Sequence, residues 1–401
     1  MGKHYWKKRL GKKDLNYINI YLSAYGALGA FLPLIGQYLK LLGFTGVQIG
    51  TVTAAGTATA IIASTFLGGL YSKSASKKRF VLKLILAVVL FCLSLYFVHI
   101  YALFLVLFCA LNFFQAPTIA LVDAMAVEDG REFGETRKWG AVGFALGAFV
   151  AGKISETVGL QVIFFIYAGC FAVLAWTMYA MSAENQDKGK AVAEKSEKPF
   201  KAVLCGNKKY VKLVICAFFI NGTVAGHNTY FGFLFVQGGG SIAGIGLVLL
   251  LMAGSEAPFM AWADKFAKVF TLEKALLAAM CVSAARFAWY SSCPSATLLL
   301  GLFVLQGMST GVIIVEFVKY VAKIVDSEEV GIAIAVYYAF GSNLSAIFCQ
   351  FTGGAILDRF GAGGVYAFFA CLNFVGVAVY AAGKLYEPAV RIEGRGEGST
   401  D

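Results

Sequence analysis

The chain has 401 residues, of which 59% are hydrophobic and only 14% are charged, and its formal net charge is +11. This composition excludes an ordinary water-soluble fold, because the apolar residues form runs as long as the roughly 20 residues that a helix needs to cross a bilayer. Backbone groups inside hydrocarbon must be satisfied within their own segment, so these runs are expected to be helices.

The apolar runs fall into two sets, separated by the only long polar stretch of the array. The first set covers 17–42, 47–72, 80–98, 101–127, 138–155 and 160–181. The second set covers 211–237, 242–263, 272–291, 295–322, 330–357 and 365–385. We therefore predict an all-α integral membrane protein with twelve transmembrane helices in two six-helix bundles.

The polar stretch defines the expected domain layout. Residues 1–181 would form an N-terminal bundle, 182–209 a cytoplasmic linker, and 210–386 a C-terminal bundle. The remaining residues, 387–401, form a tail that contains a sequence resembling a protease-recognition site and is not expected to belong to either bundle. Six plus six helices joined by a cytoplasmic linker is the layout of the major facilitator architecture.

Lysine and arginine are concentrated in alternate loops, so the positive charge is not gathered into one patch for a nucleic acid. The positive-inside rule places both termini and the central loop in the cytoplasm, which predicts a multi-pass protein of the plasma or inner cell membrane. The basic segments are 3–13, 73–79, 131–138, 188–212, 265–274, 319–323 and the tail.

Cysteine and histidine carry no metal or disulfide pattern. Most of the nine cysteines lie inside apolar runs, where small apolar filling is the simplest role. The three histidines, His4, His99 and His227, are scattered along the chain, and no phosphate-binding glycine loop is present. These features argue against an enzyme, a metal site or a cofactor, and the absence of a filter-like repeat argues against a channel.

Charged side chains within the apolar runs are the first functional candidates. Each costs roughly 2.5–3.5 kcal/mol at mid-helix on the translocon scale, so it is rarely present without a role. The candidates are Asp123, Glu256, Arg286 and Glu316, together with Arg137, which directly precedes the run 138–155. Asp123, Glu256, Arg286 and Glu316 could instead form structural ion pairs, and Arg137 could be an ordinary charge of the cytoplasmic loop.

Several segments resemble the lactose-permease-like and phenylpropionate-permease-like proton symporters of the major facilitator superfamily, in the same order along both halves. The segments are 131–147 ("REFGETRKWGAVGFALG"), 255–266 ("SEAPFMAWADKF"), Arg286, 317–321 ("FVKYV") and 352–361 ("TGGAILDRFG"). The resemblance implies alternating access by two bundles.

For the solute, the resemblance implies contacts from Arg137 and Glu256. Phe144 lies at the position where the lactose-permease-like symporters stack an aromatic ring on the sugar. His227 with Asn228 fits the phenylpropionate-like branch. Gln306 replaces a histidine of the lactose-permease-like group and is a further candidate contact. Core packing for Phe144 and an ordinary buried histidine for His227 are the alternatives.

For coupling, the pattern departs from the group, because Gln306 and Ser309 cannot carry a proton near neutral pH. The remaining candidates are Glu256, influenced by Arg286, together with Asp123 and Glu316. Asp123 could instead pair with Arg137, and Glu316 with Lys319 or Lys323.

These observations predict a functional monomer that takes up a small polar organic solute together with protons across the lipid bilayer. The solute could be a glycoside, a nucleoside or an aromatic acid. Uniport, proton-driven efflux and a non-transporting receptor remain alternatives.

Overall fold

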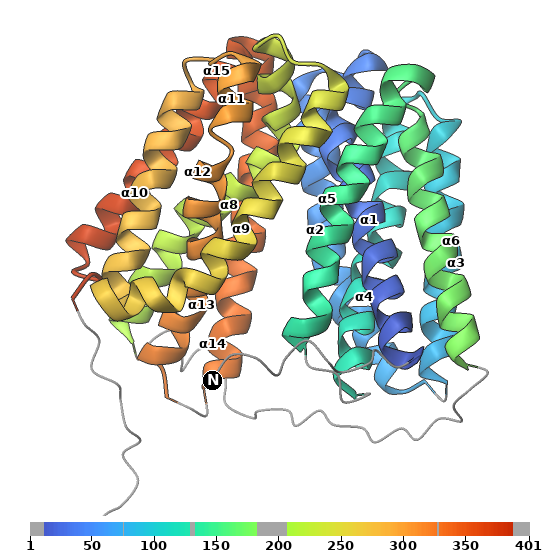
Figure 1. The fold of residues 1–401 in the computed structure, drawn as a ribbon, viewed down its shortest axis with the longest axis horizontal. Coiled ribbons are helices and arrows are strands. Elements are labelled where there is room, and N and C mark those ends of the chain that lie inside the picture. Colours follow the sequence, from blue (N-terminus) through green and yellow to red (C-terminus); the bar gives the residue numbers. More distant parts are fainter. Residues whose placement is uncertain (1–11, 75, 129–132, 183–206, 327–328, 388–401) are drawn as a thin grey trace, which may run out of the picture. The chain divides into compact units, whose positions relative to one another are not determined.

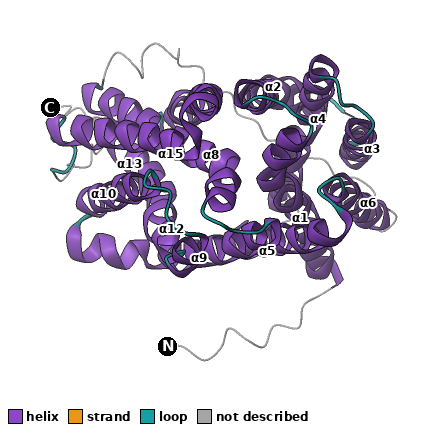
Figure 2. Cartoon of the chain, turned by 90° about the horizontal axis from the view of Figure 1, so that it is seen from above, coloured by secondary structure: helices purple, strands orange, loops and turns teal. Residues whose placement is uncertain are grey.

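The computed structural model describes the backbone of residues 12–74, 76–128, 133–182, 207–326 and 329–387. Within these ranges all regular structure is helical and no strand occurs (Figure 2). The first six helices are α1 (Lys12–Leu41), α2 (Gly46–Ser72), α3 (Lys77–Tyr96), α4 (Tyr101–Glu128), α5 (Phe133–Val158) and α6 (Val162–Ser182) (Figure 1).

The second half begins with α8 (Lys208–Gln237), α9 (Ile242–Phe270) and α10 (Leu272–Tyr290). Two composite segments follow. The first is α11 (Ala296–Gly301), α12 (Val304–Gln306), the π-helix η1 (Gly307–Gly311) and α13 (Val312–Ile324). The second is α14 (Val330–Val336), the π-helix η2 (Tyr337–Leu344) and α15 (Ser345–Ala382).

The described helices account for all twelve predicted spans. Ten segments are long and apolar enough to cross a membrane, and α10, which is not one of these ten, is a helix of 19 residues at the predicted run 272–291. The longest segment, Val330–Ala382, would be about 80 Å long if it were straight, far more than one crossing needs. It is broken at Gly361, whose φ of 65° and ψ of −169° are not helical, so it supplies two spans. The predicted fold class is confirmed.

The tenth predicted run is not one continuous α-helix. The α-helix ends at Gly301, resumes for three residues in α12, and then widens into η1 before α13. Three glycines, Gly301, Gly307 and Gly311, lie in this stretch, and glycine is a poor helix former. Short π-helical turns of this kind are frequent at functional sites.

The contacts between helices divide the chain into two compact units. One contains Met1–Ile35 and Thr59–Ala191, and the other contains Gly36–Ala58 and Val192–Asp401. Segment 36–58, which lies within the expected N-terminal bundle, therefore groups with the second unit. The reason is a set of contacts between the start of α2 and α15.

Two of these contacts use Asp358, whose carboxylate oxygens accept hydrogen bonds from the backbone N–H groups of Gly46 at 2.5 Å and Val47 at 2.9 Å. The Thr57 hydroxyl donates to Oε1 of Gln350 at 2.9 Å. A carboxylate at a helix N-terminus satisfies backbone donors that have no partner in their own helix. Asp358 thus caps α2 from a different helix.

Within the first unit, glycines allow α1 and α5 to pack backbone against backbone. A Cβ atom on Gly29 would overlap the Phe144 carbonyl group, and one on Gly147 would overlap the Gly26 carbonyl. Small residues permit this close approach of membrane helices, which is a principal source of their packing energy. The middle of α5, around Phe144 and Gly147, is thereby held against α1.

Gly29→Ala should therefore destabilise the protein by about 1–3 kcal/mol, the usual cost of forcing extra volume into a packed contact. We would measure the thermal unfolding midpoint of the purified variant in detergent. Gly169→Ala in α6 is the matched control, because no atom lies within 4 Å of the added methyl group. Equal midpoints for the two variants would show that the α1–α5 contact does not depend on Gly29.

Candidate functional site

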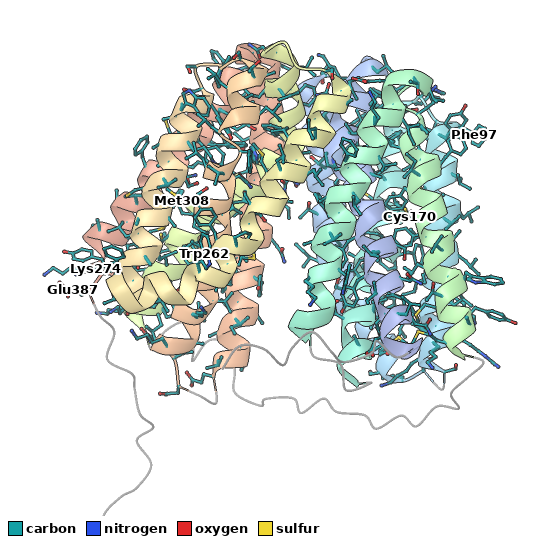
Figure 3. The ribbon with its side chains drawn as sticks, viewed as in Figure 1. Phe97, Cys170, Trp262, Lys274, Met308 and Glu387 are labelled. Carbon is teal, nitrogen blue, oxygen red and sulfur yellow. The ribbon has the colours of Figure 1, made fainter. Side chains whose placement is uncertain are left out.

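Glu256 and Gln306 meet where α9 lies against the interrupted segment α12–η1. Nε2 of Gln306 donates a hydrogen bond to Oε1 of Glu256 at 3.1 Å. Gln306 is buried and is the last residue of α12, immediately before η1 (Figure 3, where Met308 marks η1 and Trp262 marks α9). The structure therefore brings together two of the residues that the sequence singled out.

Glycines make this contact close. A Cβ atom on Gly307 would lie 2.5 Å from the carbonyl oxygen of Ser255, and one on Gly311 would lie 3.0 Å from that of Glu256. Pro258 lies two residues after Glu256 in α9. Discontinuous helices of this kind form the solute and ion sites of many secondary transporters, because their freed backbone groups can line a site.

Arg286, in α10, is a deeply buried charge that interacts with Glu256. Only 2% of its surface is exposed, and none of its three guanidinium nitrogens has a hydrogen-bond partner among the described residues. Its Cζ atom lies 4.6 Å from the ring centroid of Phe287 and 5.6 Å from that of Tyr290. Arg286 is near enough to Glu256 and His227 to interact with both electrostatically.

His227, in α8, is fully buried within a group of aromatic rings. Its Nδ1 atom lies 2.8 Å from the Tyr366 hydroxyl oxygen, and this pair forms a hydrogen bond. The imidazole centroid lies 5.9 Å from the Tyr290 ring centroid and 5.0 Å from that of Phe231. His227 thus belongs to the same cluster as Arg286, through the ring of Tyr290.

Two other candidates of the second unit lie apart from this cluster. Asn228 follows His227 in α8, and its side chain is exposed, since successive helical residues point about 100° apart. Glu316, in α13, is fully buried and its Oε1 accepts a hydrogen bond from Nζ of Lys319 at 3.1 Å. The Lys319 pairing named as the alternative for Glu316 is therefore present.

The first unit holds the remaining candidates. Asp123 is partly buried in α4, where its Oδ1 accepts a hydrogen bond from the Tyr21 hydroxyl at 2.7 Å. Phe144 is partly buried in α5. Arg137 also lies in α5, but its side chain is outside the described residues. A contact of Arg137 with Asp123 or with a solute stays a prediction.

Sequence reasoning missed the aromatic members of the cluster. The spacing of Arg286 and Tyr290, one turn apart on α10, was a usable signal, because residues i and i+4 share a helix face. Tyr366 had no such signal, because it belongs to α15 and meets His227 only through tertiary packing. No group of acidic, histidine and cysteine side chains suited to a metal ion occurs in the described part of the chain.

Comparisons with known proteins agree with this architecture. The profile of the MFS_1 like family matches residues 15–368. A maltose permease of Geobacillus stearothermophilus is 31% identical over 364 residues, covering 90% of this chain and 91% of that protein. A probable 3-phenylpropionic acid transporter of Escherichia coli (strain K12) is 24% identical over 271 residues, covering 65% and 70%. The crystal structure of the nucleoside transporter NupG has a TM-score of 0.80 at 16% identity, covering 94% and 100%, and this likeness concerns the fold.

Proposed function

The chain belongs to the MFS_1 like family of membrane transporters, and we propose that it is a secondary active transporter that takes up a small polar organic solute with protons. Transport would proceed by alternating access of its two six-helix bundles. We place it in the plasma or inner cell membrane with both termini in the cytoplasm, from the distribution of its basic loops.

The observation that carries this proposal is a carboxylate inside a membrane span, bonded to Gln306 and adjoining an interrupted helix. Glu256 can bind a solute hydroxyl group and can also exchange a proton. Arg286 interacts with it electrostatically, so the charge state of Glu256 is sensitive to what happens nearby. Such a group can link solute binding to proton binding.

The solute classes are suggested by the related proteins. Their names refer to maltose, to 3-phenylpropionic acid and to nucleosides. A glycoside, an aromatic acid and a nucleoside are therefore the first compounds to test. The proposed contacts are Arg137, Phe144, His227, Asn228, Gln306 and Glu256.

Coupling is assigned first to Glu256 with Arg286, and Asp123 and Glu316 follow as further candidates. A thermal-shift screen over the three solute classes would find the ligand, because a bound ligand raises stability by mass action. Uptake into proteoliposomes, with and without an imposed pH gradient, would then test the function. Accumulation driven by the gradient supports the proposal; flux without a pH response indicates a uniporter, and binding without flux a receptor.

Arg137→Lys should weaken solute binding about tenfold or more, because an ammonium group cannot donate two parallel hydrogen bonds as a guanidinium does. Isothermal titration with the identified solute would measure the dissociation constant. Arg359→Lys in α15 is the control, since the Arg359 side chain is exposed. Unchanged affinity in Arg137→Lys would remove Arg137 from the site.

A further inference from the structure

Buried hydrogen-bond donors without partners gather at one place in the second unit. They are the three guanidinium nitrogens of Arg286, Nε2 of His227 and the hydroxyl group of Tyr290, and none has a hydrogen-bond partner among the described residues. At most 2% of the surface of any of these three residues is exposed. Polar groups buried in this way usually have partners, because a buried donor loses its bonds to water and gains none in return.

Arg286 and His227 both adjoin Tyr290. The Arg286 Cζ atom lies 5.6 Å from the Tyr290 ring centroid, and the His227 and Tyr290 centroids are 5.9 Å apart with planes inclined by 26°. Arg286 and Tyr290 come from α10 and His227 from α8. The groups are therefore close enough to address one small ligand.

The chemistry of these groups selects an acceptor. Guanidinium offers N–H groups only, and the Tyr290 hydroxyl can donate. The Tyr366 hydroxyl has no other hydrogen bond among the described residues. When this hydroxyl donates to Nδ1 of His227, the proton of the neutral imidazole is on Nε2. Nε2 of His227 is then a hydrogen-bond donor as well. Hydrogen-bond donors from three side chains, one of which is permanently positive, suit an anionic acceptor such as a carboxylate or a halide.

Charge balance supports the same conclusion. A buried guanidinium is costly unless an anion compensates it. Glu256 interacts with Arg286 electrostatically but forms no ion pair with it within 4.0 Å, and its described hydrogen bond is to Gln306. When Glu256 is protonated, a bound monovalent anion would keep the region neutral.

We propose that Arg286, His227 and Tyr290 form a binding site for a monovalent anion, either the carboxylate of the transported solute or a free halide. In the first case the inference rests on the proposed function and narrows the solute to organic acids. The interrupted segment α12–η1 contacts α10. A change of conformation in this segment could give an anion access to the site.

The test is a thermal-shift titration of the purified full chain at constant ionic strength. Benzoate is compared with benzamide, its uncharged analogue, and sodium chloride is titrated separately. We expect benzoate or chloride to raise the unfolding midpoint in a saturable way, and benzamide to have no such effect. A shift with benzoate identifies a carboxylate as the ligand, and a shift with chloride alone identifies a halide.

Variants assign the effect to the site. Arg286→Gln should abolish the shift, and Tyr290→Phe, which keeps the ring and removes one donor, should weaken apparent affinity roughly tenfold. Arg359→Gln, at an exposed arginine of the same unit, should retain it. If Arg286→Gln does not fold, Tyr290→Phe decides alone.

Three results would overturn the proposal: no anion-dependent shift in the wild-type protein, a shift that persists in both site variants, or an equal shift with benzamide. None of them bears on whether the protein accumulates a solute in proteoliposomes. Conversely, an anion-dependent rise of the unfolding midpoint in a protein without transport activity would support the anion site and count against the proposed function.

Discussion

We expect Glu256→Gln to abolish proton-driven accumulation of the solute and to leave exchange of solute across the membrane partly intact. The amide has the shape of a protonated carboxyl group and can still bond to Gln306, but it cannot release or take up a proton. The variant is thus fixed in a state that resembles the protonated one. We expect the solute still to bind and to cross the membrane, but the pH gradient should no longer drive its accumulation.

The expected size of the effect follows from the gradient. One pH unit corresponds to about 1.36 kcal/mol, so one proton per solute can drive roughly tenfold accumulation. The measurement is uptake into proteoliposomes with an imposed gradient of one unit, beside counterflow without a gradient. Glu256→Gln should bring the accumulation ratio to about one.

Glu156→Gln in α5 is the matched control, because the Glu156 side chain is partly exposed and forms a surface ion pair with Lys153 at 3.5 Å. It should accumulate solute as the wild type does. Full accumulation by Glu256→Gln would refute the assignment of the coupled proton to Glu256. Asp123 and Glu316 would then be the remaining candidates for the proton-carrying residue.

Lys323→Met has the largest expected effect on stability. The Lys323 ammonium group lies 2.7 Å from Oε1 of Glu273, whose side chain is fully buried, while the Lys323 side chain is 32% exposed. Removing one member of a buried ion pair typically costs about 3–5 kcal/mol, because the other charge is left without its counter-ion. The exposure of Lys323 reduces this, and we expect about 2–3 kcal/mol.

The unfolding midpoint in detergent measures the effect. Lys153→Met is the control, because its pair with Glu156 is exposed on both sides and such pairs contribute about 0–1 kcal/mol. Adding Glu273→Gln to Lys323→Met should restore part of the stability, since it removes the buried charge that has lost its Lys323 partner. A midpoint unchanged by Lys323→Met would mean that Glu273 is stabilised by its other contacts.

Hydropathy located the helices well and their ends less well. The first helix was expected to begin at residue 17 and begins at Lys12, and the eighth was expected to end at 263 and ends at Phe270. Polar residues extend both helices beyond the apolar run. A helix can continue into water, where polar side chains are solvated, so an apolar run marks the span in hydrocarbon and not the whole helix.

The candidate site was only partly visible in advance. Glu256 and Arg286 stood out because a charge within an apolar run is costly wherever the helix packs. The contact of Glu256 with Gln306 and that of His227 with Tyr366 join residues far apart in the chain. The sequence named three of these four residues and could not pair them.

The sequence by itself determined the fold class, the number of spans and the charges that lie within them, because these depend on transfer of side chains between water and hydrocarbon. Only the tertiary structure decided that segment 36–58 joins the second unit and that the tenth span is interrupted. It alone placed Arg286 among the rings of Phe287 and Tyr290. These features depend on which helix faces meet, and the approach of Gly307 to Ser255 shows why: a close contact requires a match between two surfaces, and hydropathy describes only one.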